Sequence, residues 1–178
     1  HLSLRRQRQM CIRDRGAQAA AQRVAEAALP LLQGPGTQAF KTDAPAPPAP
    51  RMGDLIVLSG LEHARPGWRP ELEVVSEQKI EPVRTGGLLD EAPAVEVLLA
   101  GTSNGRRSQF AERLGMGLGR EGWNMSLDGG QFSGALLIAL KQRDQWPKSL
   151  KVLIWEFSEN ALSLPLTPDE KAVLARLP

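Results

Sequence analysis

The nine residues from Val95 to Ser103, VEVLLAGTS, restrict the fold of this chain more than any other segment. Apart from Glu96 the run is apolar up to Ala100, which is typical of a buried β-strand. It leads into a turn of small residues that ends in a serine. In an open parallel sheet, ligands bind at the carboxyl ends of the strands. The sequence therefore predicts that Ser103 lies at a sheet edge where a ligand would bind.

The segments after this turn continue as an alternation of helices and strands. Short connections join a strand over Val95–Ala100, a helix over Ser108–Leu118, a strand over Trp123–Leu127, a helix over Gly134–Gln145 and a strand over Lys151–Phe157. Strands that alternate with helices in this way predict an α/β fold with a mainly parallel sheet and right-handed crossovers. The three strand ends would then meet at one edge.

The first half of the chain is less regular. Gly16–Leu32 is rich in alanine and is expected to be a helix that is interrupted or ended near Pro30. Gln33–Pro50 has the Gly/Pro-rich composition of a surface connector. Weaker signals in this half are a short helix or strand within Arg51–Leu61 and β-like pieces at Leu72–Val75 and Ile80–Val83. Near the C-terminus, Thr167 is expected to cap a last helix.

Residues 1–15 differ from the rest of the chain. HLSLRRQRQMCIRDR carries five arginines, one aspartate and the only cysteine, Cys11. The run resembles a translated sequencing adaptor, so it is set apart here from the domain over residues 16–178. The alternative, a basic arm for nucleic acid or membrane, lacks the aromatic residues and helical periodicity expected of one.

Composition excludes several classes of function. Of 22 basic and 20 acidic residues, 17 and 19 remain once residues 1–15 are set aside, which gives a net charge of −2 and no case for a nucleic-acid partner. No run of residues is apolar over a transmembrane length. No His/Cys/carboxylate cluster has metal-ligand spacing, and no Walker lysine follows the Gly101–Gly105 turn. We therefore expect neither a metal nor another cofactor.

Three strand ends carry the residues from which a site could be built. Ser103 could act as a nucleophile if a base lay beside it, or it could be an ordinary turn serine or helix cap. Gly130, after the second strand, could lend its N–H to an oxyanion, or it could belong to a simple turn. Trp155 and Glu156, at the end of the third strand, could contact a sugar ring and its hydroxyls, or could be a core tryptophan and a solvated acid.

The sequence gives Ser103 no obvious histidine partner. His1 lies in the N-terminal run, and His63 lies in an irregular segment that favours a surface position over a catalytic one. Asp43 is followed by Ala and Pro, so it is not part of an acid–histidine motif either.

Four segments resemble the alginate O-acetyltransferase family of the AlgJ and AlgX type, which is SGNH-hydrolase-like. The matching runs are LLAGTS at Leu98–Ser103, DGGQ at Asp128–Gln131, VLIWEF at Val152–Phe157 and RMGDL at Arg51–Leu55. The resemblance extends over about Gly16–Leu162. It implies a three-layer sandwich with a mainly parallel sheet that is incomplete at its N-terminal side.

The resemblance also implies a mechanism. Ser103 corresponds to the family's nucleophile, whose partners come from an Asp-x-His-Trp motif shortly before a Gly-Ala-rich helix. Gly16 begins such a helix here, and residues 1–15 stand where the motif belongs. The sequence is therefore expected to be a fragment with little activity of its own. A second departure is Ser158–Asn160, where the family has Pro-Glu-Arg.

The function that follows from the resemblance is transfer of acetyl groups to polysaccharide hydroxyls through an acetylated Ser103. Gly130 and the Ser103 N–H would bind the oxyanion, and Trp155 and Glu156 the substrate. The family implies an alginate-like glycan, a membrane-bound acyltransferase that supplies acetyl groups, and a periplasmic location with a possible inner-membrane anchor. The alternatives are a carbohydrate acetyl-esterase and a non-catalytic glycan-binding module.

Overall fold

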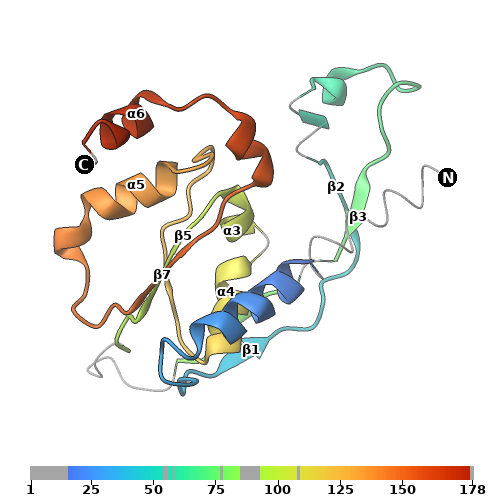
Figure 1. Cartoon of the computed structure of the whole chain (residues 1–178). Helices are drawn as coiled ribbons and strands as arrows, with labels where there is room; N and C mark the ends of the chain where they lie inside the picture. Colours follow the sequence, from blue (N-terminus) through green and yellow to red (C-terminus); the bar gives the residue numbers. More distant parts are fainter. Residues whose placement is uncertain are drawn as a thin grey trace.

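The computed structural model describes residues 16–53, 56–57, 59–76, 78–84, 93–107 and 109–176. The N-terminal run with Cys11, the expected helix start at Ser108 and part of the RMGDL segment lie outside the described residues. Figure 1 shows a sheet with helices on both sides and a thin ribbon that extends away from this body.

A parallel sheet of three strands forms the centre of the body. β5 (Val97–Ala100) lies between β6 (Trp123–Asn124) and β7 (Val152–Trp155), and both neighbours run parallel to it. β5 is buried along its whole length, as expected for a strand that is covered on both faces. The predicted parallel sheet is confirmed, although each strand is shorter than its apolar run.

Helices cover the two faces of the sheet. On one face, the helix over residues 16–28 and α4 (Phe110–Leu118) bury a cluster of alanine and leucine side chains against Val97 and Leu99. On the other face, α5 (Gly134–Lys141) packs Ala135 and Ala139 against Leu98 and Ala100. The alternation of side chains along β5 thus supplies both cores, and the expected three layers are confirmed.

The first helix ends close to where Pro30 predicted. Helical geometry stops at residue 28, and a turn follows through Gly34, whose amide donates to the Leu29 carbonyl at 2.9 Å. The Arg120 side chain then binds this turn to the body by donating to the carbonyls of Gly34 at 2.6 Å and Leu32 at 3.2 Å.

Two strands lie inside the stretch that was expected to be a connector. β1 (Phe40–Thr42) pairs antiparallel with β4 (Ile80–Pro82), and β2 (Ala49–Arg51) pairs antiparallel with β3 (Glu73–Val75). The connector prediction was wrong at these two places because both partners lie far along the chain. Pro50 is compatible with β2, since a two-stranded ribbon has an open edge where no N–H is needed.

The β2–β3 ribbon extends from the body and carries the short 3-10 helix η1 (Leu61–His63) beyond it (Figure 1). Trp68 lies in this outer part and is 81% exposed. The ribbon is therefore a surface feature.

The C-terminal part covers the α5 side of the body (Figure 1). It contains η3 (Glu159–Ser163) and α6 (Pro168–Leu174), whereas η2 (Arg143–Gln145) lies between α5 and β7 in the chain. Thr167 caps α6 as predicted: its hydroxyl accepts from the Glu170 amide at 3.3 Å, and the Glu170 carboxylate accepts from the Thr167 amide at 2.7 Å. A hydrogen bond from the Ser133 hydroxyl, followed by those from Thr167, lowers the pKa of Glu170.

Within the described ranges, no helix has the length and apolar character needed to cross a bilayer.

Candidate active site

The loops after the three strands lie side by side, as the sequence predicted. Beyond the strand ladder, the Leu127 amide donates to the Gly101 carbonyl at 2.9 Å, and the Glu156 amide donates to the Ala100 carbonyl at 2.9 Å. These two bonds join the loops that follow β6 and β7 to the turn that follows β5. A ligand at this edge would meet all three loops.

Ser103 is the first residue of α3 (Ser103–Arg107), a single helical turn that follows β5. The sequence analysis missed this turn, because five residues that include a glycine give no periodic signal. Ser103 is half-buried. Among the residues that the structure describes, none forms a hydrogen bond with its hydroxyl or accepts its amide hydrogen. The role of Ser103 as a nucleophile stays a prediction.

Thr102, the buried residue before Ser103, is bound by the Glu156 side chain. The Thr102 amide donates to Glu156 Oε2 at 2.6 Å, and the Thr102 hydroxyl lies 3.1 Å from Oε1 and 3.0 Å from Oε2. The same hydroxyl accepts from the Asn104 amide at 3.2 Å. Glu156 thus contacts the turn beside Ser103, and its expected contact with substrate stays a prediction.

Two glycines let the turn pack closely against Ser126 and Glu156. A Cβ atom on Gly101 would lie 2.7 Å from Ser126 Oγ and 2.8 Å from Glu156 Oε2. On Gly105 it would lie 2.6 Å from Ser126 Oγ. Such distances are shorter than van der Waals contact, so larger residues would displace the turn. Ser126 Oγ is buried and has no hydrogen-bond partner among the described residues.

Gly130 lies in the loop after β6, in a turn in which Gly129 has a φ of +75°. Its amide donates to the Leu127 carbonyl at 3.2 Å, and its carbonyl accepts from the Gly134 amide at 2.8 Å. To bind an oxyanion, the Gly130 N–H would have to exchange the Leu127 carbonyl for the ligand. The oxyanion role of Gly130 stays a prediction.

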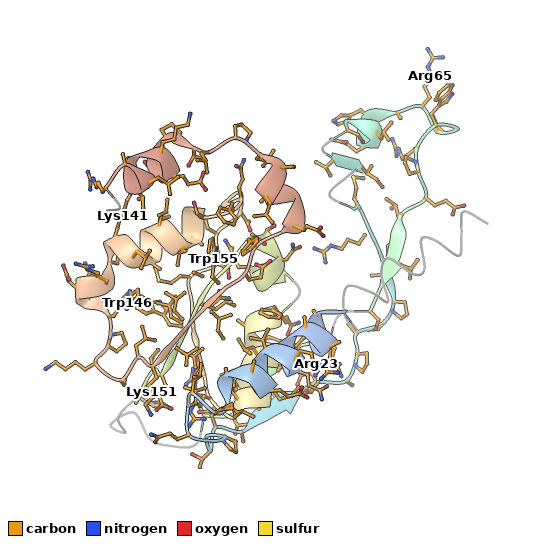
Figure 2. The ribbon with its side chains drawn as sticks, in the orientation of Figure 1. Arg23, Arg65, Lys141, Trp146, Lys151 and Trp155 are labelled. Carbon is orange, nitrogen blue, oxygen red and sulfur yellow. The ribbon has the colours of Figure 1, made fainter. Side chains whose placement is uncertain are left out.

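Trp155 belongs to a cluster of three aromatic rings. Its ring centroid lies 4.7 Å from that of Phe132 and 4.9 Å from that of Phe157, which lie 4.9 Å from each other. The Trp155 indole N–H donates to the Phe132 carbonyl at 2.9 Å, and the residue is 37% exposed. Figure 2 shows Trp155 between the sheet and α5. An exposed ring that its neighbours hold in place is suited to stack on a sugar.

The expected surface position of His63 is confirmed. Its side chain is 86% exposed, its Nε2 lies 3.5 Å from Glu62 Oε1, and η1 lies far from α3 in Figure 1. No three His, Cys, Asp or Glu side chains of the described ranges form a group that could hold a metal ion. The described residues therefore place no histidine beside Ser103.

The sequence analysis missed Thr102, Ser126 and Phe132 as parts of this site. The alternation of side chains along a strand could have indicated that Glu156 and Trp155 make different contacts. If Trp155 points to one face of the sheet, Glu156 points to the other. No local signal marks Ser126, whose contacts with Gly101 and Gly105 join segments that are distant in the sequence.

The chain is similar in sequence to known proteins. The family described as "SGNH hydrolase-like domain, acetyltransferase AlgX" matches residues 12–159. The alginate biosynthesis protein AlgX of Pseudomonas syringae pv. tomato is 30% identical over 112 residues, which are 61% of this chain and 23% of that protein.

Two solved structures have the same fold. The O-acetyltransferase domain of Pseudomonas putida AlgJ matches with a TM-score of 0.67 and 25% identity, over 92% of this chain and 56% of that one. Pseudomonas aeruginosa AlgX matches with a TM-score of 0.59 and 26% identity, over 81% of this chain and 34% of that one. The chain therefore spans about a quarter of the curated relative and about a third to a half of the solved structures.

The expected SGNH-hydrolase-like fold is thus confirmed. Because the family match extends over most of its length, the chain belongs to the AlgX family of SGNH hydrolase-like acetyltransferase domains.

Proposed function

We propose that the protein transfers acetyl groups to polysaccharide hydroxyls through an ester on Ser103. The Ser103 oxygen attacks the carbonyl carbon of an acetyl ester and loses its proton to a base, and the donor leaves as an alcohol. A sugar hydroxyl then attacks the acetyl-serine, which returns the Ser103 hydroxyl and gives the acetylated sugar. The observation that carries this proposal is the placement of Ser103, next to a fixed turn at the carboxyl edge of a sheet whose family has acetyltransferase members.

The amide of Ser103 is the first candidate for oxyanion binding. It belongs to the first residue of α3 and has no acceptor among the described residues. Gly130 is the second candidate, once its bond to Leu127 is exchanged. Trp155 would stack on the sugar that accepts the acetyl group.

The base is the part of this mechanism that the described residues do not supply. We propose, from the family resemblance, that the base is a histidine oriented by an aspartate, as in the family's Asp-x-His-Trp motif. Members of a catalytic triad act as a unit, so a serine without them loses several orders of magnitude in rate. We therefore expect slow acetyl transfer from this chain alone.

The substrate and the cellular setting are part of the same proposal. The curated relative from Pseudomonas syringae is an alginate biosynthesis protein, which supports an alginate-like glycan as acceptor. By the same resemblance we propose a periplasmic location and a membrane-bound acyltransferase that supplies the acetyl group.

Product analysis separates acetyl transfer from ester hydrolysis. The chain is incubated with an activated acetyl ester, with and without alginate oligosaccharides, and free acetate and acetylated sugar are measured. Acetyl transfer predicts acetylated sugar that disappears in Ser103→Ala. Acetate alone, at the same rate in both conditions, would favour the esterase instead.

The aromatic cluster favours one further candidate, a glycan-binding module without serine chemistry. Titration of oligosaccharides against the chain and against Ser103→Ala, with Trp155→Ala as the binding-deficient comparison, addresses this alternative. Binding that is equal in the first two, together with no acetyl on Ser103 by mass spectrometry, would favour the module.

A further inference from the structure

We propose that Glu156 is a positioning residue: its carboxylate fastens Thr102 and so holds the turn that presents Ser103. This inference rests on the proposed function, because the turn matters for activity only if Ser103 reacts. In this role the Glu156 carboxylate binds Thr102 and not the substrate. A residue that follows β7 thus fixes the geometry of the turn that follows β5.

The turn needs such an anchor because its own backbone holds it weakly. α3 has only five residues, and a single helical turn is not stable without further contacts. It is preceded by Gly101, a residue type with wide backbone freedom. Apart from the helical bonds of α3 itself, two backbone bonds fix the turn: Leu127 N–H to the Gly101 carbonyl at 2.9 Å, and Gly105 N–H to the Thr102 carbonyl at 3.1 Å.

The Glu156 carboxylate adds the strongest contacts at this place. Both of its oxygens are engaged, by the amide and the hydroxyl of one residue, Thr102. Hydrogen bonds to a charged acceptor are about twice as strong as neutral ones. The hydroxyl in turn accepts from the Asn104 amide at 3.2 Å, so the anchor reaches both neighbours of Ser103.

The backbone of Glu156 is itself fixed. Its amide donates to the Ala100 carbonyl at 2.9 Å, which extends the pairing of β7 with β5 by one residue. Because side chains alternate along a strand, the Trp155 ring and the Glu156 carboxylate point to opposite sides. One dipeptide therefore contributes the aromatic surface and the anchor for the reactive turn.

The test measures local amide exchange and Ser103 reactivity in the full chain. In Glu156→Gln, the amides of Thr102, Asn104 and Gly105 should exchange about tenfold faster, since a charge-assisted hydrogen bond is lost. Amides in α5 should not change. The rate at which an activated acetyl ester labels Ser103 should fall with the same variant, while oligosaccharide affinity stays the same.

Two further variants serve as controls. Glu159→Gln removes an exposed carboxylate from the same loop and should leave exchange at the turn unchanged. Thr102→Ser keeps the amide and the hydroxyl and should retain protection, whereas Thr102→Val removes the hydroxyl and should lose part of it.

The outcomes separate the anchor from the proposed function. Unchanged exchange at the three amides in Glu156→Gln, or a change spread equally over α5, would overturn the anchor, even if Ser103 is acetylated. Faster exchange confined to the turn, in a chain whose Ser103 never reacts, would support the anchor and contradict acetyl transfer.

Discussion

At the scale of single residues, the neighbours of Ser103 make the contacts that fix the turn. Thr102 takes the hydrogen bonds, Gly101 and Gly105 allow close packing, and Ser103 is left with a hydroxyl that no described residue binds. Preorganisation of this kind is what an enzyme needs, because a nucleophile displaced by about 1 Å reacts far more slowly.

Gly105→Ala tests the packing beneath the turn. The new Cβ would lie 2.6 Å from Ser126 Oγ, so we expect a loss of about 1–3 kcal/mol in the free energy of unfolding, measured by urea denaturation. Alanine is the better helix former, so without the clash the change would stabilise the protein.

Ser126→Ala provides the matched partner for this substitution. It removes a buried hydroxyl that has no partner among the described residues, so alone it should be nearly neutral. The double variant should regain most of the stability lost in Gly105→Ala. Additive effects of the two changes would show that the stability lost in Gly105→Ala does not come from a clash with Ser126 Oγ.

At the scale of elements, Glu96 connects parts of the chain that are far apart in sequence. Its carboxylate accepts from Lys151, just before β7, and from Arg120, whose guanidinium also binds the turn after the first helix. Hydrogen bonds from Lys151 first and Arg120 second hold the pKa of Glu96 below its ordinary value. The first helix, β5 and β7 are thus joined by one acid.

These contacts predict a pH dependence of stability. Because the folded pKa of Glu96 lies below the unfolded one, the ionised acid stabilises the fold above the unfolded pKa, and this contribution is lost as the pH falls through the folded value. Glu170, whose pKa is also lowered, acts in the same direction. Urea denaturation at neutral and acidic pH should show lower stability in acid.

Glu96→Gln should lower the free energy of unfolding by about 1–2 kcal/mol at neutral pH and reduce its loss in acid. Glu159→Gln, in an exposed position, is the control and should change neither quantity. An acid-induced loss of stability that is the same in Glu96→Gln and the parent chain would contradict the assignment.

At the scale of the whole molecule, the body and the projecting ribbon differ in how they are held. The body has two apolar cores on its sheet, whereas β2 and β3 are three residues each and pair with one another. A two-stranded ribbon of this size is only marginally stable on its own.

Brief digestion with chymotrypsin should therefore cut after Trp68 before it cuts after Trp123 or Trp155; the Trp146–Pro147 bond is not a substrate for this protease. Trp68 is 81% exposed on the ribbon, while Trp123 and Trp146 pack against the α5 core and Trp155 belongs to the aromatic cluster. Mass spectrometry of the first fragments gives the order. An earlier cut after Trp123 would show that the body opens more readily than the ribbon.

The body was predictable because its signals are local. The run before Gly101 is continuously apolar, α4 has a clear helical period, and Thr167 begins α6 with a recognisable cap. The pairs β1–β4 and β2–β3 were not predictable in full, because β1 and the last two residues of the run APAPPAP acquire strand structure only through distant partners.

The position of the candidate site was predicted better than the contacts within it. Ser103 and the Trp155–Glu156 dipeptide were selected because they lie at strand ends, and the structure brings these strand ends together. The bond between Glu156 and Thr102 joins residues 54 positions apart and carries no sequence signature.

The most direct test of the account is the location of the acetyl group after reaction with an activated acetyl ester. Lysine acetylation is expected on the surface, so the ester-linked, hydroxylamine-sensitive acetyl groups are mapped by mass spectrometry. The account predicts slow accumulation on Ser103, ahead of every other serine and threonine, and none at this position in Ser103→Ala. Ester-linked acetyl groups spread over exposed hydroxyls, with no preference for Ser103, would contradict it.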